Sequence, residues 1–235
     1  MRTALRATRP ELHRLFEELF AEYGPQAWWP GDSPFEIAAG ALLVQRTQWR
    51  NAARAIENLT TSGLMTADAV AESDPDALES LISAVGFYRQ KAARLRSMAS
   101  WIVQSGGFET LSRRPTAELR PALLSVPGIG PETADSILLY AFARPAFIAD
   151  AYARRLFMRM GWISGSRPSE YDRVRNSVMS VLDEDAPFYN EFHALIVRHG
   201  KAACRSQPVC EICPARNGCD LGLARCSTGR RKFDR

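Results

Sequence analysis

The stretch that decides the fold of this chain is Leu124-Ser125-Val126-Pro127-Gly128-Ile129-Gly130. An apolar helical segment, 115–125, leads into it, and a second helical segment, 132–142, follows it. Glycine tolerates tight turns and lets the backbone approach another group closely. The order of helix, glycine-rich turn and helix is a helix–hairpin–helix pattern. Taken alone, the same pattern is also found in ordinary connections between helices.

The turn would expose backbone N–H groups at the start of the second helix. Those groups, together with the positive end of the helix dipole, suit an anionic ligand such as a DNA phosphate. Val126 and Ile129 place an apolar residue on each side of the turn, and Pro131 stands where a first helical residue is expected. Gly128 and Gly130 are therefore predicted DNA-binding residues.

Helical periodicity dominates the rest of the chain. Apolar residues recur at i, i+3 and i+4 along 10–23, and the segment 35–45 is nearly all apolar, which indicates a buried helix. No segment alternates convincingly between apolar and polar residues, so we predict an all-α fold without strands. Further helices are expected at 47–59, 66–72, 75–85, 89–105, 151–160, 170–182 and 187–199.

The composition excludes few functions. Of the 235 residues 46% are hydrophobic, and the net charge of +4 is compatible with nucleic-acid binding without demanding it. The basic residues are nearly all arginine, as a GC-rich genome also produces, and the lysines are Lys91, Lys201 and Lys232. There is no signal-peptide pattern and no apolar run of membrane-spanning length. We therefore expect a cytoplasmic, nucleoid-associated protein without a membrane partner.

Asp150 follows the extended segment 147–149 and precedes a helical segment, which is the position of a helix N-cap. Most isolated aspartates at such a position do no more than cap the helix. A capping carboxylate also stays ionised, and an ionised carboxylate beside a sugar can stabilise positive charge at C1′ while a base departs. The two roles are compatible.

Four cysteines lie close together near the C-terminus, with the spacing C-x5-C-x2-C-x5-C: Cys204, Cys210, Cys213 and Cys219. Four thiolates on one loop are the ligands of an iron–sulfur cluster. Zinc is the alternative, although zinc sites more often show two separate C-x2-C pairs and this chain has one. With Cys226 the count is odd, which argues against a secreted disulfide scaffold. We predict a 4Fe-4S cluster.

Taken together, the hairpin, Asp150, the His199-Gly200-Lys201 segment and the cysteine quartet resemble the endonuclease III superfamily of helix–hairpin–helix DNA glycosylases. The resemblance covers roughly residues 15–220. It implies that Asp150 is the catalytic carboxylate. It also implies that Gln45 fills the gap left by a flipped base. Lys201 is a predicted DNA contact, because a cluster would fold a loop whose basic residues can touch phosphate.

The same resemblance implies two domains. A six-helix barrel with the hairpin would span 32–145, and an iron–sulfur cluster domain would be formed by 1–31 and 146–235, with DNA bound between them. The expected partner is double-stranded DNA containing damaged bases, and the expected state is a monomer. Family members often hold a monovalent or divalent cation at the hairpin, so such an ion is also allowed here.

The chain departs from the bifunctional members of the family at Glu132. Those members carry a lysine two residues after the second hairpin glycine, and a carboxylate in its place cannot form a Schiff base. We therefore predict a monofunctional glycosylase, in which Asp150 orients a water molecule or stabilises an oxocarbenium-like transition state. As a structural alternative, Glu132 complements the helix dipole. Asp135, on the same helix, could face the base or pack between helices.

The aromatic residues suggest the substrate. Trp28-Trp29-Pro30-Gly31 and Trp49 look like the 3-methyladenine glycosylase branch, in which such aromatics sandwich an alkylated base. N-alkylated purines carry positive charge in the nucleotide and are attracted to indole faces and to a carboxylate such as Glu132. The predicted base pocket is therefore Trp28, Trp29, Trp49 and Glu132, although tryptophan pairs are often only core residues.

Two rival functions remain at this stage. One is a bifunctional endonuclease III-type glycosylase and AP lyase that acts on oxidised pyrimidines and uses an unusual amine. The other is a catalytically silent DNA-binding homologue that has kept the fold.

Overall fold

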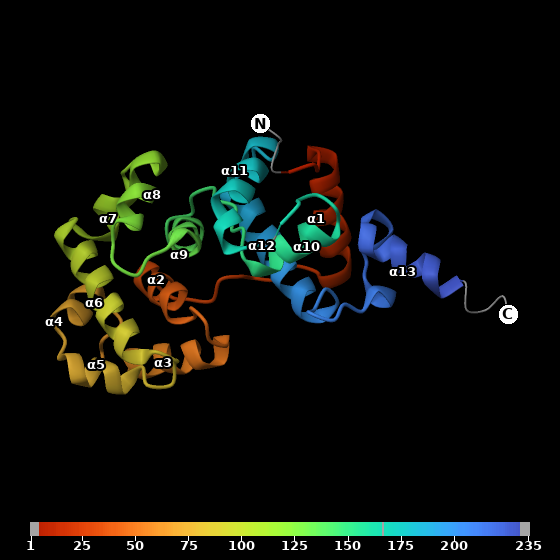
Figure 1. Ribbon diagram of the computed structural model, residues 1–235. Helices are drawn as coiled ribbons and strands as arrows, with labels where there is room; N and C mark the ends of the chain where they lie inside the picture. Colours follow the sequence, from red (N-terminus) through yellow and green to blue (C-terminus); the bar gives the residue numbers. More distant parts are fainter. Residues whose placement is uncertain (1–4, 166, 231–235) are drawn as a thin grey trace. The chain divides into compact units, whose positions relative to one another are not determined.

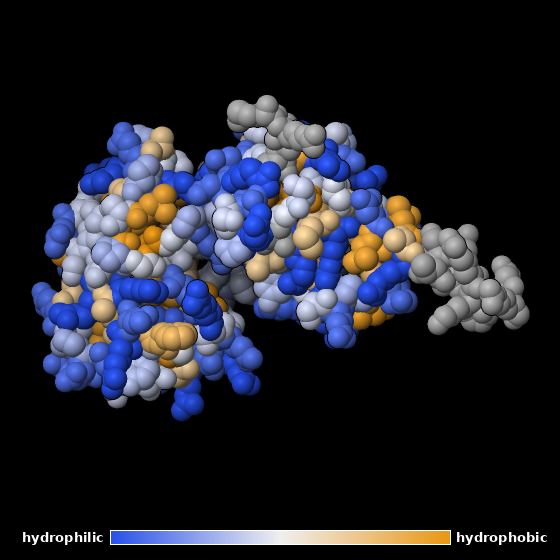
Figure 2. Space-filling model, viewed as in Figure 1, coloured by the Kyte–Doolittle hydropathy of each residue, from blue (hydrophilic) through white to orange (hydrophobic). Residues whose placement is uncertain are grey.

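The computed structural model describes residues 5–165 and 167–230, with side chains up to Arg225. Within the described residues every regular element is a helix and there is no strand, which confirms the predicted all-α fold (Figure 1). No helix in this part of the chain is both long and apolar enough to cross a membrane. The face in Figure 2 is mostly polar, and its apolar residues gather in separate patches.

Contacts between residues divide the chain into two compact units. The hairpin unit is one segment, Trp29–Arg144, and the terminal unit combines the residues up to Trp28 with those from Pro145 onward. The helices of the hairpin unit are α2 (Pro34–Leu43), α3 (Trp49–Thr61), α4 (Ala67–Glu72), α5 (Pro75–Leu81), α6 (Tyr88–Gln104), α7 (Gly107–Ser112), α8 (Thr116–Leu124), α9 (Pro131–Ser136) and the π-helix η1 (Ile137–Ala141). The terminal unit contains α1 (Arg9–Tyr23), α10 (Ala151–Arg159), η2 (Pro168–Glu170), α11 (Tyr171–Val181), α12 (Ala186–Ala202), η3 (Cys210–Ile212), η4 (Arg216–Gly218) and α13 (Asp220–Arg230).

Helix α2 is the buried core of the hairpin unit and packs against α3, α6, α9 and η1. Ser33 begins it by accepting a hydrogen bond from the Glu36 N–H at 3.1 Å. The sequence predicted a helix over 35–45, but α2 ends at Leu43, and the chain turns at Arg46 with a φ of 53°. Gln45 therefore lies on a turn between two helices.

Helices α8 and α9 flank the predicted turn and form the helix–hairpin–helix. Gly128 has a φ of 90°, a conformation that residues with a Cβ rarely adopt, and Pro131 is the first residue of α9. A bidentate ion pair joins the two helices: Arg120 Nε donates to Asp135 Oδ1 at 2.8 Å and Nη2 to Oδ2 at 3.0 Å. The predicted helix 132–142 continues past α9 as η1.

Aromatic packing forms the core of the terminal unit. Phe147 stacks on Phe157, with ring centroids 5.8 Å apart, and contacts Tyr189 and Phe192 of α12. Each buried aromatic ring removes a large apolar area from water. This core holds α10 and α12 beside each other and thereby fixes the helix that begins after Asp150.

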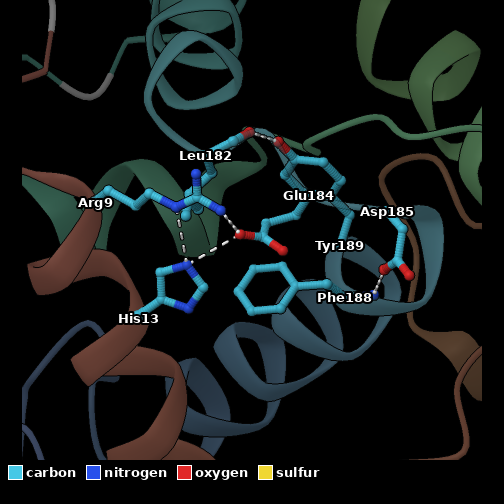
Figure 3. A network of polar contacts seen from close by, with 7 residues as sticks. All are labelled: Arg9, His13, Leu182, Glu184, Asp185, Phe188 and Tyr189. Carbon is cyan, nitrogen blue, oxygen red and sulfur yellow. Dashed lines mark hydrogen bonds and ion pairs between the residues drawn. The ribbon is translucent and has the colours of Figure 1, made fainter.

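A polar network fastens α1 to the segment that precedes α12 (Figure 3). Arg9 Nη2 donates to Glu184 Oε1 at 2.5 Å, and His13 Nε2 lies 3.0 Å from the same oxygen. Asp185 caps α12 by accepting the Phe188 N–H at 2.9 Å, and the Tyr189 hydroxyl donates to the Leu182 carbonyl. The start of α12 is therefore held at several points.

Candidate functional site

Asp150 caps α10, as the sequence indicated. Its Oδ1 accepts the Ala153 N–H at 2.8 Å, and the residue is 8% exposed. Its other oxygen, Oδ2, lies 3.6 Å from Nε2 of His193, a buried residue of α12. The carboxylate is therefore held in one orientation at the N-terminus of α10.

The two hairpin glycines have different environments. A Cβ on Gly128 would lie 2.3 Å from the Cγ and Cδ atoms of Arg94, so this position is closed to a side chain. Gly130 is the N-cap residue of α9, and a Cβ there would meet no atom within 4 Å. The outer side of the turn at Gly130 is therefore open to a ligand.

Glu132 is an exposed residue of the first turn of α9. Neither of the two described lysines lies on that helix. Lys91 is buried on α6 and donates from Nζ to the Leu43 carbonyl at 2.9 Å, and Lys201 is exposed on the last turn of α12. Lys232 lies outside the described residues.

The structure brings together part of the predicted base pocket within the hairpin unit. The rings of Trp29 and Trp49 meet edge to face at 5.0 Å, and Tyr140 of η1 lies 5.1 Å from Trp29. Trp28 belongs to the terminal unit, where the Lys201 ammonium lies 6.0 Å from the centre of its ring. Sequence reasoning missed Tyr140, because an apolar helical segment gives no sign of which aromatic will meet a tryptophan.

All four clustered cysteines line one pocket of the terminal unit. Cys204, Cys210 and Cys219 are buried, and none of the four forms a disulfide. No group of three or more histidine, cysteine or acidic residues in the described part is arranged to hold a metal ion. A donor set of four cysteine sulfurs fits an iron–sulfur cluster, and four thiolates also suit tetrahedral zinc.

The clustered cysteines share a buried environment. Burial and, to a smaller extent, the charges of the other three cysteines raise the pKa of the Cys213 thiol to about 11. Four thiolates would therefore repel one another strongly unless iron supplied compensating positive charge. Burial, together with the charge of Arg155, lowers the pKa of the neighbouring His199 to about 4, which keeps that imidazole neutral.

Two arginines of α10 hold the start of the cysteine loop. Arg155 donates to the carbonyls of Cys204 and Gly200 at 3.0 and 3.1 Å. Arg159 donates to Cys204 Sγ at 3.2 Å and to the Arg205 carbonyl at 2.6 Å. The helix capped by Asp150 at one end therefore supports the cysteine loop at the other.

Phe87 is a further residue that the sequence did not single out. It is 66% exposed and has a φ of 58°, an uncommon backbone conformation for an aromatic residue. It immediately precedes α6 and follows Gly86. A large apolar side chain held in solvent by an unusual turn is a candidate contact for a ligand.

Comparison with known proteins identifies the family of this chain. The model of the HhH-GPD superfamily, described as base excision DNA repair proteins, matches residues 39–183. A putative DNA repair glycosylase of Methanocaldococcus jannaschii is 40% identical over 211 residues, which cover 88% of this chain and 95% of the relative. The chain therefore belongs to the HhH-GPD superfamily of base excision DNA repair proteins, as one of its DNA glycosylases.

Solved structures agree with this assignment. The H. pylori 3-methyladenine DNA glycosylase bound to 1,N6-ethenoadenine is 27% identical, with a TM-score of 0.69 over 83% of this chain and 98% of that one. An endonuclease III in a non-covalent DNA complex is 21% identical, with a TM-score of 0.77 over 94% of this chain and 99% of that one. The second likeness shows the fold alone. The family match and the endonuclease III of Thermotoga maritima, 30% identical over 80% of this chain and 83% of that relative, confirm the resemblance to the endonuclease III superfamily.

Proposed function

We propose that this glycosylase is monofunctional and releases N-alkylated purines from double-stranded DNA by hydrolysis. The observation that carries the monofunctional part is Glu132 at the position of the Schiff-base lysine. Lys91 and Lys201 are no substitutes on α9, because one is buried against the Leu43 carbonyl and the other lies on α12. Water is then the nucleophile.

In this proposal Asp150 supplies the negative charge. Departure of a purine leaves positive charge on the sugar, and a fixed carboxylate stabilises that charge without having to reorient. Asp150 is suited to this role because its cap bond to Ala153 fixes one oxygen. The second oxygen would face the sugar or hold the attacking water.

The aromatic residues support the choice of substrate. A cationic purine gains from the faces of Trp and Tyr rings, and the hairpin unit gathers Trp29, Trp49 and Tyr140. The Lys201 ammonium lies 6.0 Å from the centre of the Trp28 ring, and this contact supports the choice of a cationic ligand. Glu132 would add a carboxylate to the base pocket. The similar H. pylori enzyme is named for a methylated purine.

DNA would be held by the hairpin and by exposed cations. The N–H groups of the turn at Gly128 and Gly130 would bind a phosphate, and Lys201 would contact the backbone. Phe87 would enter the base stack when the nucleotide is extruded, because an exposed apolar wedge can separate base steps. We further propose that Cys204, Cys210, Cys213 and Cys219 hold a 4Fe-4S cluster that organises this part of the terminal unit. Iron content and visible absorbance of the purified protein test that assignment.

The proposed reaction predicts base release without strand cleavage. On duplexes carrying one 3-methyladenine or 7-methylguanine, the free base should appear, while the strand should break only after alkali is added. Borohydride should trap no covalent complex, because a carboxylate at position 132 forms no imine. The measurement is chromatography of released bases beside denaturing electrophoresis of the strand.

Other outcomes of this experiment would favour the rivals. Strand cleavage without alkali and a borohydride-trapped complex, on duplexes carrying an oxidised pyrimidine, would support the bifunctional enzyme. Retained DNA affinity with no release from any lesion would support the catalytically silent homologue.

A further inference from the structure

The side-chain amide of Gln45 is engaged by the hairpin. Its Nε2 donates to the Gly128 carbonyl at 3.2 Å and to Thr133 Oγ1 at 2.9 Å. These partners are two separate points of the hairpin, since Gly128 lies in the turn and Thr133 lies on α9. One amide nitrogen therefore connects the turn that follows α2 with two points of the hairpin.

Arg94 of α6 completes the arrangement. Its Nη1 donates to Gln45 Oε1 at 3.2 Å, and a cation at that oxygen directs the NH2 group of the amide toward the hairpin. The Cγ and Cδ atoms of the same side chain lie where a Gly128 Cβ would be. Arg94 therefore both orients Gln45 and covers the backbone of the residue that Gln45 holds.

Lys91, one turn earlier on α6, holds the other end of the same segment. Its Nζ donates to the Leu43 carbonyl at 2.9 Å, which satisfies an acceptor at the C-terminus of α2. Burial lowers the pKa of this amine, and the charge of Arg94 lowers it further. Two cations of α6 thus fix the segment 43–45 from one side.

We infer that Gln45 and Arg94 are positioning residues for the hairpin, which hold the Gly128 turn in its binding conformation before DNA arrives. The inference rests on the proposed role of the hairpin in binding DNA. It differs from the role that the family resemblance gave to Gln45, because a side chain that enters the gap must first give up three hydrogen bonds. Loss of a residue that positions the hairpin should weaken binding to every DNA duplex equally. Loss of a residue that fills the gap left by a flipped base should weaken binding only to a duplex with an extruded nucleotide.

The test compares two kinds of duplex. Dissociation constants are measured for an undamaged duplex and for a duplex with a tetrahydrofuran abasic analogue opposite each of the four bases. Gln45→Ala should weaken binding to all of them by the same factor, roughly five- to thirty-fold, as expected for one or two lost hydrogen bonds. Arg94→Ala should give a similar loss, and the double variant should lose less than the product of the two, because both residues serve one network.

Two further variants show whether the loss of affinity comes from the hydrogen bonds of Gln45 or from other changes in the same segment. Gln45→Glu keeps an acceptor for Arg94 but offers no N–H to the Gly128 carbonyl, so it should bind as weakly as Gln45→Ala. Gln48→Ala removes an exposed amide from the same segment and should leave affinity unchanged. Amide hydrogen exchange of residues 126–131 in the DNA-free protein should accelerate in Gln45→Ala and in Arg94→Ala alone.

Two results would overturn parts of this account, and they are distinguishable. The inference fails if Gln45→Ala leaves undamaged-duplex affinity and hairpin exchange unchanged and alters only the preference among opposite bases. The proposed hairpin function fails if Gly130→Glu, which places a negative charge in open space at the turn, does not weaken DNA binding.

Discussion

The Asp150→Asn variant should lose about 10²- to 10⁴-fold in the rate of base excision, the range typical of a lost charge or acid–base group. Asparagine has nearly the shape of aspartate and is an equally good N-cap, so its side-chain oxygen can still accept the Ala153 N–H. The substitution therefore removes the negative charge and keeps the fold of α10. Single-turnover release of 3-methyladenine or 7-methylguanine from a duplex measures the effect.

A second capping aspartate of the terminal unit provides the control for Asp150→Asn. Asp185 caps α12 in the same way, by accepting the Phe188 N–H at 2.9 Å. Asp185→Asn should excise at the parent rate and melt at the parent temperature. If Asp150→Asn also excised at the parent rate, the carboxylate of residue 150 would not be the group that stabilises the sugar cation, and the proposed mechanism would have to be abandoned.

The features that the sequence predicted correctly are local. The all-α fold follows from apolar periodicity, and the cap of α10 follows from one aspartate placed before a helical segment. The turn at Gly128 could also be predicted from the sequence, because only glycine readily adopts a φ of 90°. Each of these features depends on residues that are neighbours in the chain.

What the sequence did not predict depends on distant residues. Gln45 meets hairpin partners 83 and 88 positions away, and Arg94 reaches it from 49 positions away. The end of α2 at Leu43 also depends on a distant residue. The apolar pattern of the segment continues beyond Leu43, but Lys91 of α6 donates a hydrogen bond to the Leu43 carbonyl and the chain turns there. No periodicity within the segment records a partner on another helix.

The largest effect on stability should come from the ion pair that joins α8 to α9. The sequence left open whether Asp135 faces the base, and the structure places it at 0% exposure with both oxygens bound to Arg120. Breaking a buried pair by removing one partner costs about 3–5 kcal/mol, because the remaining buried charge loses the opposite charge that compensates it most closely. Arg120→Met should therefore lower the unfolding temperature by roughly 6–20 °C, at 2–4 °C per kcal/mol for a chain of this size. Thermal melting followed by circular dichroism measures it.

Two comparisons show whether the effect on melting comes from an unpaired buried charge. The double variant Arg120→Met/Asp135→Leu removes both charges, so it should recover most of the loss. Glu109→Gln breaks an exposed pair with Arg113, whose side chains are 81% and 74% accessible, and should cost about 0–1 kcal/mol. If Arg120→Met melted at the same temperature as Glu109→Gln, another group would have to compensate the charge of Asp135. The contact between α8 and α9 would then not depend on this ion pair. If instead the double variant melted as low as Arg120→Met, lost packing rather than charge would be the cause.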